Sequence, residues 1–392
     1  MKKSKNKNLW IFSEAREISD FEKFLLFVFV IAGIICLVIF ADWWFKKDHI
    51  GNIWLYWALS LFFWYSISRM VLGWINFLHI KKPLKTPEPP KGLKVAIFTT
   101  SYAGEPLEMI EKTLRACRNI KYPHNTYLLD NTDDPAFKEA AEKNGAHWFE
   151  LKNIPGAKAG KVNKALEKTT EEFILILDPD HIPSPEFLDY TLGFFKDEKV
   201  GFVQVSQAYY NQYRSFTAKG AAEQTYSFYG PTQMGLNGLG CAVAIGANCT
   251  FRRQALESIG GHGVGLAEDL LTSIRLHSKG WKSVYNPVIV SRGLVPEDFG
   301  SFCKQQLKWA RGVFEILFED LPKLYKGLSA WQKFSYTTIG AYYLVGIINF
   351  FFTLLPFIFL TTGILPARMP FEEFLINGLS VLFIATVIYF FV

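Results

Sequence analysis

The sequence predicts an α/β domain in a chain that also crosses a membrane. Three observations lead to this fold class. Short β-rich runs alternate with helix-length segments between residues 94 and 206, the pattern of a parallel sheet with helices on both faces. Four long apolar runs carry no charged residue, which is typical of transmembrane helices. Two aspartates follow the most apolar of the short runs, at the strand end where open α/β folds bind ligands.

The uncharged runs cover residues 24–41, 51–68, 334–367 and 374–392. Because roughly 20 apolar residues cross a bilayer, we expect at least four transmembrane helices. The third run is 34 residues long, which is too long for one straight span, so we expect it to begin at the membrane surface and to bend near Pro356. Buried helices of a soluble core are the alternative, which the lengths and the flanking residues of these runs disfavour.

Lysines flank the first two runs and predict the orientation of this hairpin. They lie before the first run and after the second: Lys2, Lys3, Lys5, Lys7, Lys81, Lys82 and Lys85. By the positive-inside rule both ends of the hairpin face the cytosol, and the short loop with Lys46, Lys47 and Asp48 lies outside. We therefore expect a multi-pass protein of the cell (inner or plasma) membrane with a cytosolic globular domain. The first run is too long for a secretory signal and lacks a small-residue cleavage site.

Composition restricts the partners. Half of the 392 residues are hydrophobic and the mean hydropathy is positive, which a soluble enzyme seldom shows. Lysines near the membrane explain much of the net charge of +6, as contacts to anionic lipid. Basic and aromatic residues do not interleave as they do in nucleic-acid-binding proteins, so we expect a lipid bilayer and no nucleic acid among the partners. The five cysteines show no C-x-x-C spacing, which predicts a reduced cytosolic domain without structural zinc.

The globular part begins after a segment rich in proline and lysine. We expect strands at 94–100, 126–129, 147–151, 174–177 and 201–206, and helices at 105–119, 135–144, 157–168 and 185–195. Gly145 suits the C′ position that closes the second of these helices. A longer amphipathic helix over 299–324 directly precedes an apolar run, so we expect it to lie along the membrane surface.

Asp178 and Asp180 follow the strand 174–177, with Pro179 between them. Mg²⁺ or Mn²⁺ held by one or two carboxylates shares its remaining positions with water and substrate phosphates. The pair therefore suggests a metal-bridged diphosphate. The alternative is a solvated turn, since proline and aspartate are turn formers, and the motif taken alone favours it.

Other polar residues occupy comparable positions. Asp130 follows the second strand and could accept hydrogen bonds from a base or ribose, although an Asx-turn with Asn131 is an equally good interpretation. Lys158 and Lys161 open the helix after Gly156, so their charge and the helix N-terminus could both face phosphate. A solvated helix face is the commoner fate of such lysines.

Two further groups lie later in the chain. Glu268 and Asp269 open a helix after a glycine-rich stretch, where acidic residues complement the helix dipole or present a general base. Gln305, Lys308 and Trp309 share one face of the helix over 299–324, because residues three and four apart coincide. A tryptophan beside a membrane run is most often an interfacial anchor.

Eight stretches, taken together, resemble the membrane-embedded processive glycosyltransferases of family 2, the group of cellulose synthases, other β-glucan synthases and hyaluronan synthases. They fall in the family's order and cover roughly residues 93–325. The stretches read VAIFTTSYAGEP, LLDNTDDP, GAKAGKVNKAL, LILDPDHIP, FVQVSQAYYN, GANCTFRRQALESIGG, AEDLLTSIRLHSKGWKSVY and VPEDFGSFCKQQLKWARG.

The resemblance implies a GT-A domain with a Rossmann-like mixed sheet that uses a nucleotide sugar, most often UDP-linked, such as UDP-glucose. It also implies a role for each candidate residue. The residues expected to contact the nucleotide sugar are Asp130, Lys158, Asp178, Asp180 and Lys308. Asp178 and Asp180 are expected to hold the metal, with His181 as a further candidate ligand. Asp269 corresponds to the catalytic base of the motif T-E-D, and Gln305 and Trp309 of the motif Q-x-x-R-W are expected to contact the acceptor.

The chain departs from the family pattern in three respects. Ala267 stands where threonine is usual, and Lys308 stands where arginine is usual, although the two are not equivalent at a forked phosphate contact. Arg311, one turn on, could compensate for Lys308. The chain stops inside an apolar run, without a cyclic-dinucleotide-binding domain and with few helices after the catalytic region, so we expect a truncated or unusually short member.

These inferences predict six segments: a cytosolic basic N-terminus (1–23), a transmembrane hairpin (24–80), a linker (81–92), a GT-A domain (93–298), an amphipathic interfacial helix (299–325) and at least two C-terminal transmembrane helices (330–392). We expect an inverting, metal-dependent enzyme that elongates a β-linked polysaccharide. Its partners are a glycan or lipid-linked acceptor and, as candidates, further copies of the chain or export subunits. The alternatives are a non-processive transferase acting on a lipid carrier and a non-catalytic membrane subunit that binds sugar nucleotide.

Overall fold

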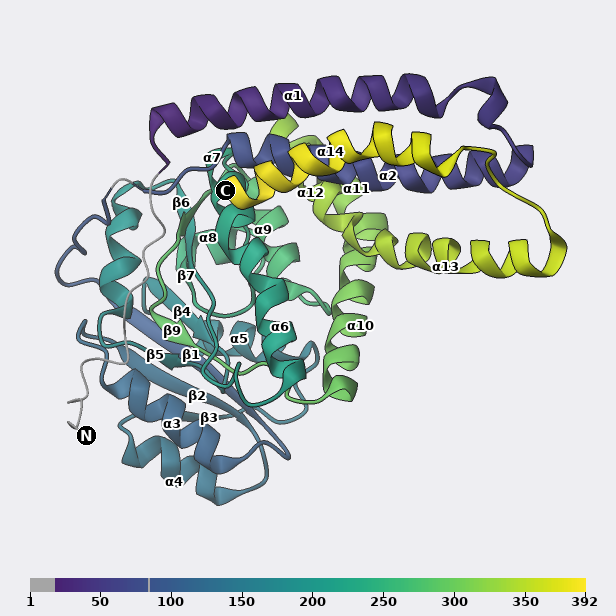
Figure 1. Ribbon diagram of the computed structural model, residues 1–392. Helices are drawn as coiled ribbons and strands as arrows, with labels where there is room; N and C mark the ends of the chain where they lie inside the picture. Colours follow the sequence, from purple (N-terminus) through teal and green to yellow (C-terminus); the bar gives the residue numbers. More distant parts are fainter. Residues whose placement is uncertain (1–17, 84) are drawn as a thin grey trace, which may run out of the picture. The chain divides into compact units, whose positions relative to one another are not determined.

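The computed structural model describes residues 18–83 and 85–392, so the predicted lysine cluster at residues 2–7 lies outside the described part. These residues form two compact units. One unit is Lys81–Gly340, and the other combines residues 18–80 with Ala341–Val392. Figure 1 shows both units, coloured along the chain.

The first unit is built on a mixed seven-stranded sheet in the order β3-β2-β1-β4-β7-β6-β8. All five predicted strands are present, and β7 and β8 are additional. In this sheet β7 runs antiparallel to both of its neighbours, whereas the other pairings are parallel. The strands are β1 (Val95–Tyr102), β2 (Asn125–Asn131), β3 (His147–Glu150), β4 (Phe173–Leu177), β6 (Val200–Val205), β7 (Cys249–Arg252) and β8 (Lys282–Asn286).

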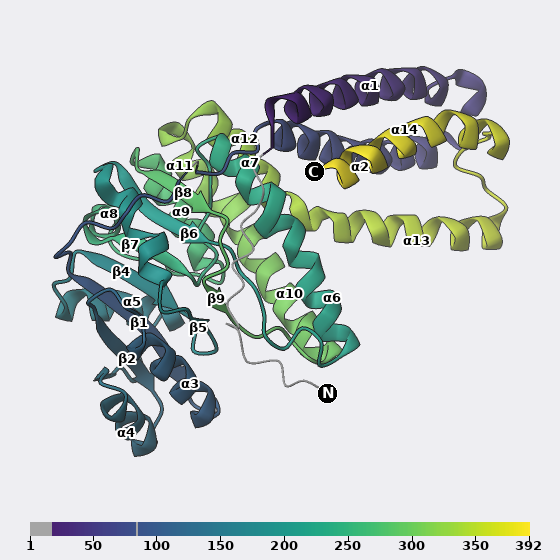
Figure 2. The same ribbon diagram turned by 60° about the vertical axis from the view of Figure 1, so that its left-hand side comes forward.

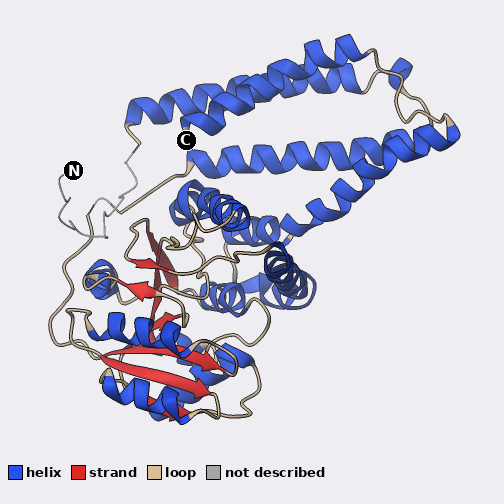
Figure 3. Cartoon of the chain, turned by 60° about the horizontal axis from the view of Figure 1, so that its bottom comes forward, coloured by secondary structure: helices blue, strands red, loops and turns tan. Residues whose placement is uncertain are grey.

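The core lies on both faces of this sheet, which Figure 3 shows in red between blue helices. Successive residues of β4 alternate between two apolar clusters, with Leu175 in one and Ile176 in the other. All five residues of β4 are buried, as expected for a strand covered on both faces. The apolar run that predicted this strand therefore occupies the centre of the domain.

The predicted helices are found with bounds shifted by at most two residues, apart from two regions. The helices of this unit are α3 (Leu107–Arg118), α4 (Pro135–Lys143), α5 (Ala157–Lys168), α6 (Phe216–Ser227), α7 (Gln233–Gly238), α8 (Arg253–Ser258), α9 (Glu268–Ser278), α10 (Phe299–Glu315), α11 (Leu321–Leu324) and α12 (Ala330–Gly340). Two short antiparallel strands, β5 (Ile182–Pro183) and β9 (Ser291–Arg292), pair outside the main sheet.

The predicted helix over 185–195 is wrong in type, because two 3-10 helices, η2 (Phe187–Tyr190) and η3 (Leu192–Lys196), replace it. Close packing explains the difference: a Cβ on Gly193 would lie 1.8 Å from the carbonyl oxygen of Pro87. The predicted continuous helix over 299–324 is also interrupted, by the π-helical turn η5 (Ile316–Asp320) between α10 and α11. Pro322 lacks the N–H that would continue regular α-helical bonding into this turn.

The second unit contains α1 (Asp20–Trp44), α2 (Ile53–Leu78), α13 (Val345–Thr362) and α14 (Phe371–Phe391). Helix α1 packs along α14 and α2, as Figures 1 and 2 show. Four helical segments in the described residues, Asp20–Trp44, Ile53–Leu78, Ala330–Thr362 and Phe371–Phe391, are long and apolar enough to cross a membrane. The interruption of the third segment is the 3-10 turn η7 (Tyr342–Leu344), whereas α13 continues through Pro356.

Candidate active site

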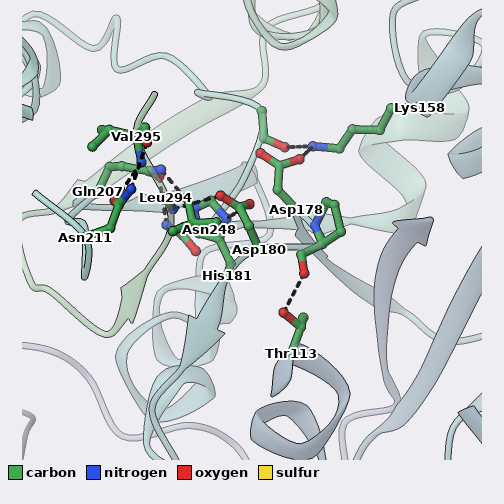
Figure 4. A network of polar contacts seen from close by, with 12 residues as sticks. Thr113, Lys158, Asp178, Asp180, His181, Gln207, Asn211, Asn248, Leu294 and Val295 are labelled. Carbon is green, nitrogen blue, oxygen red and sulfur yellow. Dashed lines mark hydrogen bonds and ion pairs between the residues drawn. The ribbon is translucent and has the colours of Figure 1, made fainter. Parts of the chain in front are cut away.

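The turn after β4 presents the first two candidate carboxylates at the carboxyl edge of the sheet. Strand β4 ends at Leu177, so Asp178 and Asp180 are the first polar side chains beyond it. The hydroxyl of Thr113 donates to the carbonyl oxygen of Pro179 at 2.7 Å and fixes the turn (Figure 4). The sequence-based prediction therefore has the expected geometry: a rigid turn that aims two carboxylates at one place.

Asp180 is held by a chain of polar contacts that joins four separate segments of the chain (Figure 4). Its Oδ1 lies 2.9 Å from Nδ1 of His181, and its Oδ2 accepts the Leu294 N–H at 2.8 Å. The other ring nitrogen of His181, Nε2, lies 2.8 Å from the amide nitrogen of Gln207, whose oxygen accepts from Asn248 at 2.9 Å. Burial raises the pKa of Asp180, but His181 and these hydrogen bonds outweigh it and hold the pKa below its ordinary value.

Asp178, Asp180 and His181 can each bring a ligand atom within 4.8 Å of the other two. Carboxylate oxygens are the ligands that Mg²⁺ and Mn²⁺ prefer, so the two aspartates fit such an ion. His181 differs, because both of its ring nitrogens already have protein partners. To coordinate a metal it would have to release Gln207 or Asp180, so the aspartates are the stronger ligand candidates.

Lys158 joins this turn to the later part of the chain. Its ammonium group donates to Asp178 Oδ1 and to the carbonyl oxygen of Gly246. The side chain is only 14% exposed, so the charge depends on these partners. Burial alone lowers the pKa of Lys158, but Asp178, Glu268 and Asp269 together raise it above its ordinary value. The lysine is therefore a buried cation among acidic groups and not part of a solvated helix face.

Asp269 lies in the first turn of α9, on the other side of Gly246. A Cβ on Gly246, which has φ +82°, would lie 3.4 Å from Asp269 Oδ2. Burial, followed by the charge of Glu268, raises the pKa of Asp269 to about 7, against the opposing effects of the Leu270 N–H and Lys158. A carboxylate with a pKa near neutrality is suited to general-base catalysis. The structure therefore brings together Lys158, Asp178 and Asp269, which are far apart in the sequence.

Asp130 lies at the same edge of the sheet, because it pairs in register with Ser101 near the end of β1. It is 1% exposed, and its carboxylate accepts hydrogen bonds from Ser101, Thr132 and Trp148. The Asx-turn predicted as an alternative is found in part, since the Thr132 N–H bonds the carboxylate two residues back. Asp130 is thus firmly oriented.

The two residues predicted to contact the acceptor, Gln305 and Trp309, lie on α10 together with Lys308, which was predicted to contact the nucleotide sugar. Lys308 is exposed, whereas Gln305 and Trp309 are half-buried. This helix packs on the segment before α9, because a Cβ on Gly312 would lie 2.7 Å from the Ala267 nitrogen. Arg311, the expected substitute for Lys308, instead pairs with Glu315 at 2.8 Å. Lys308 therefore remains the cation of this motif.

Sequence reasoning missed several residues that shape the site. Gln207 supports His181, and Trp148 and Ser101 hold Asp130. Lys161, which the sequence did single out, donates to the Ser101 carbonyl at 2.8 Å. Lys161 is 1% exposed, so its interpretation as a solvated residue is wrong, and burial lowers its pKa to about 8. Ser101, Lys161 and Gln207 lie in three of the stretches that carried the family resemblance, whereas Trp148 lies in none of them.

The sequence profile of the family described as "Glycosyl transferase family group 2" matches residues 173–392, more than half of the chain. The chain belongs to this glycosyltransferase family. It is 31% identical over 314 residues to a cellulose synthase catalytic subunit (UDP-forming) of Komagataeibacter sucrofermentans, which covers 76% of the chain and 41% of that protein. Identity to the corresponding Pseudomonas fluorescens subunit is 29%, over 71% of the chain and 39% of that protein.

This family 2 glycosyltransferase thus spans about two fifths of the length of these relatives. Among solved structures it is similar to a mannosyltransferase of Pyrobaculum calidifontis in complex with GDP-Man and Mn²⁺. That similarity has a TM-score of 0.57 at 16% identity, over 85% of this chain and 98% of that one. The predicted GT-A fold is thereby confirmed.

We expect activity to require a divalent metal, because the carboxylates of Asp178 and Asp180 lie close enough together to bind one ion. EDTA should abolish turnover, and Mg²⁺ or Mn²⁺ should restore it. Asp180→Asn should weaken Mn²⁺ binding, measured by calorimetry, by at least about tenfold. Asp197→Asn, on an exposed residue that pairs with Lys282, is the matched control. Full turnover in chelator would exclude the metal.

We expect Asp269→Asn to lower turnover by about 10²–10⁴-fold while leaving donor affinity nearly unchanged, because the amide keeps the shape and loses the basic lone pair. In the unmodified enzyme, turnover should rise as the pH passes upward through about 7, where Asp269 loses its proton. Glu268→Gln is the control. It should shift this pH limb downward, since the charge of Glu268 raises the pKa of Asp269. Loss of donor affinity with turnover retained at saturation would instead make Asp269 a binding residue.

Proposed function

We propose that the protein is a membrane-bound, inverting glycosyltransferase that transfers a hexose from a UDP-sugar to elongate a β-linked polysaccharide. The observation that carries the proposal is the position of Asp269 beside the Lys158–Asp178 pair, across Gly246. A base with a pKa near neutrality thus adjoins a cation and a carboxylate suited to a diphosphate. The relatives named as UDP-forming cellulose synthase subunits support UDP as the leaving nucleotide.

In the proposed reaction, Asp269 accepts the proton of the acceptor hydroxyl. The acceptor oxygen forms its bond to the anomeric carbon while the bond from that carbon to the diphosphate oxygen breaks, so the configuration inverts in one displacement. Lys158 offers a positive charge to the diphosphate as it leaves. A bound Mg²⁺ or Mn²⁺, held by Asp178 and Asp180, supplies further neutralisation of the diphosphate charge.

The acceptor side of the proposal rests on α10. Trp309 offers an aromatic ring to the C–H face of an acceptor sugar, and Gln305 lies one turn before it. Lys308 is exposed and free of the ion pair that engages Arg311, so it is available to the leaving diphosphate. We infer that growth of a glycan chain, as opposed to a single transfer to a lipid carrier, depends on this face of the helix.

The direct test is incubation of membranes containing the protein with a panel of UDP- and GDP-sugars, followed by product sizing and linkage-specific digestion. A long β-linked product from one UDP-sugar supports the proposal. A product extended by one sugar on a lipid indicates the non-processive alternative, and metal-dependent donor binding without any transfer or hydrolysis indicates the non-catalytic subunit. The size of the product also shows whether further copies of the chain or export subunits are required.

We expect Trp309→Ala to shorten or abolish the polymer while donor binding stays measurable. Lys308→Ala should weaken nucleotide-diphosphate affinity by about tenfold, as expected for loss of a charge-assisted hydrogen bond. Lys308→Arg should be tolerated, since arginine keeps the charge and adds a forked donor pair. Lys304→Ala, one turn earlier on the same helix, is the control.

These measurements compare samples that contain equal amounts of membrane-inserted protein for each variant and for the unmodified protein. If product length, turnover and donor affinity are unchanged in both Trp309→Ala and Lys308→Ala, α10 is only a membrane anchor.

We further propose that both ends of the α1–α2 hairpin face the cytosol. A reporter fused after Lys85 should behave as cytoplasmic, because lysines gather at that end of the hairpin. A reporter fused after Asp48, in the loop between the helices, should behave as external. The reverse pattern would separate the catalytic unit from a cytosolic supply of nucleotide sugar and contradict the proposed function.

A further inference from the structure

The carboxylate of Asp130 has only one place left for a ligand. A carboxylate accepts hydrogen bonds at about four lone-pair sites, two on each oxygen. The hydroxyl of Ser101 and the N–H of Thr132 donate to Oδ1 at 2.7 and 2.9 Å, which fills that oxygen. The indole N–H of Trp148 donates to Oδ2 at 2.9 Å. A single lone pair therefore remains, on Oδ2.

A groove of about 620 Å³ adjoins this carboxylate. Thr132 is the link between them, because it lines the groove and its N–H bonds Asp130. Thr132 is only 5% exposed, and its buried hydroxyl has no hydrogen-bond partner among the described residues. A buried, unpartnered hydroxyl beside a groove is free to bond a ligand.

Tyr102 directly precedes Ala103, which lines the same groove, and one face of the Tyr102 ring is occupied. The ammonium group of Lys161 lies 3.3 Å from the centre of this ring, and it also donates to the Ser101 carbonyl at 2.8 Å. A planar base could therefore stack only on the other face of Tyr102. A stacking surface and one acceptor lone pair thus adjoin the groove through its lining residues Ala103 and Thr132, the second of which also offers a hydroxyl.

We propose that Trp148 determines which nucleobase the donor site accepts, by restricting Asp130 to a ligand with a single N–H donor. The inference rests on the proposed function and on the sequence-based expectation that Asp130 contacts the base of the donor nucleotide. Uracil has one N–H between two carbonyl groups, so Oδ2 can accept that N–H while the Thr132 hydroxyl donates to a neighbouring carbonyl. Guanine presents two adjacent donors, N1–H and the exocyclic amine, and only one of them finds an acceptor.

Burial makes this selection effective. Asp130 is 1% exposed, so a base that reaches it has left its water behind. A donor stranded there loses its hydrogen bond to water without replacement, which is how buried polar sites reject ligands that do not match them. Trp148 is therefore a specificity residue that acts through Asp130.

The test compares the affinities of UDP, GDP and IDP, with Mg²⁺ present, by calorimetry on the detergent-solubilised full chain. IDP has the ring size of GDP but lacks its exocyclic amine, so the IDP to GDP ratio isolates the second donor from the size of the base. We expect the unmodified protein to bind UDP most tightly and IDP more tightly than GDP. Tighter binding of GDP than IDP would overturn the proposal without any variant.

Trp148→Phe keeps an aromatic ring and frees the second lone pair of Oδ2. We expect GDP affinity to rise relative to IDP affinity by about tenfold, as expected for one hydrogen bond to a charged group. Trp281→Phe is the matched control, since Trp281 donates an indole N–H to Ser258 at the same 2.9 Å outside this network. It should leave the ratio unchanged.

The outcomes separate the two proposals. If the unmodified protein binds none of the three nucleotides, the proposed function fails. If it binds UDP but the IDP to GDP ratio is the same in Trp148→Phe and in the unmodified protein, only the role of Trp148 fails. If Trp148→Phe does not fold, the IDP to GDP affinity ratio of the unmodified protein is the test. Tighter binding of IDP supports the proposal, and tighter binding of GDP overturns it.

Discussion

The candidate site depends on one buried cation. Lys158 places its ammonium group between Asp178 and the Gly246 carbonyl, within the field of Glu268 and Asp269. Without it, the carboxylates of Asp178, Glu268 and Asp269 would lose the positive charge that offsets their mutual repulsion. The lysine thus allows the end of β4 and the start of α9 to lie close together.

Close backbone approaches complete this arrangement. Gly246 lies between Lys158 and Asp269 with φ +82°, a conformation that residues with a side chain rarely adopt, and a Cβ there would come into contact with the carboxylate of Asp269 at 3.4 Å. Gly293 makes room for the His181 ring in the same way, since a Cβ would lie 2.6 Å from it. Both glycines lie in irregular segments, and each allows a functional side chain to approach the backbone of another element.

The sequence predicts those parts of the fold that depend on local patterns. Five of the six parallel strands, all except β8, were predictable because each is a short apolar run with turn residues after it. Strand β7 was not, because Cys249 and Phe251 are its only apolar residues and its position follows from the left-handed backbone of Asn248, with φ 55°. The long helix over 299–324 was predicted without its π-helical turn, which arises where Pro322 interrupts the backbone bonding.

In the candidate site, too, local sequence patterns predict some residues and not others. Asp178, Asp180 and Asp269 could be found because each stands where a strand ends or a helix begins. The bond from Trp148 to Asp130 could not be found, since it depends on the register of β2 and β3, in which Trp148 faces Leu128. Asp130 is two residues further on, so its side chain lies on the same face of the sheet as Trp148. Contacts of this kind follow from strand register and not from any local pattern.

In the proposed function, Lys158 also couples the donor side of the site to Asp269, the proposed base. Burial and Glu268 raise the pKa of Asp269, whereas the charge of Lys158 lowers it. A diphosphate would attract the same ammonium group that Asp178 now engages. If the ammonium moved toward the diphosphate, it would oppose the protonation of Asp269 less, and the pKa of the base would rise. The affinity of the base for a proton is therefore linked to occupancy of the donor site through one side chain, with Gly246 as the fixed point between them.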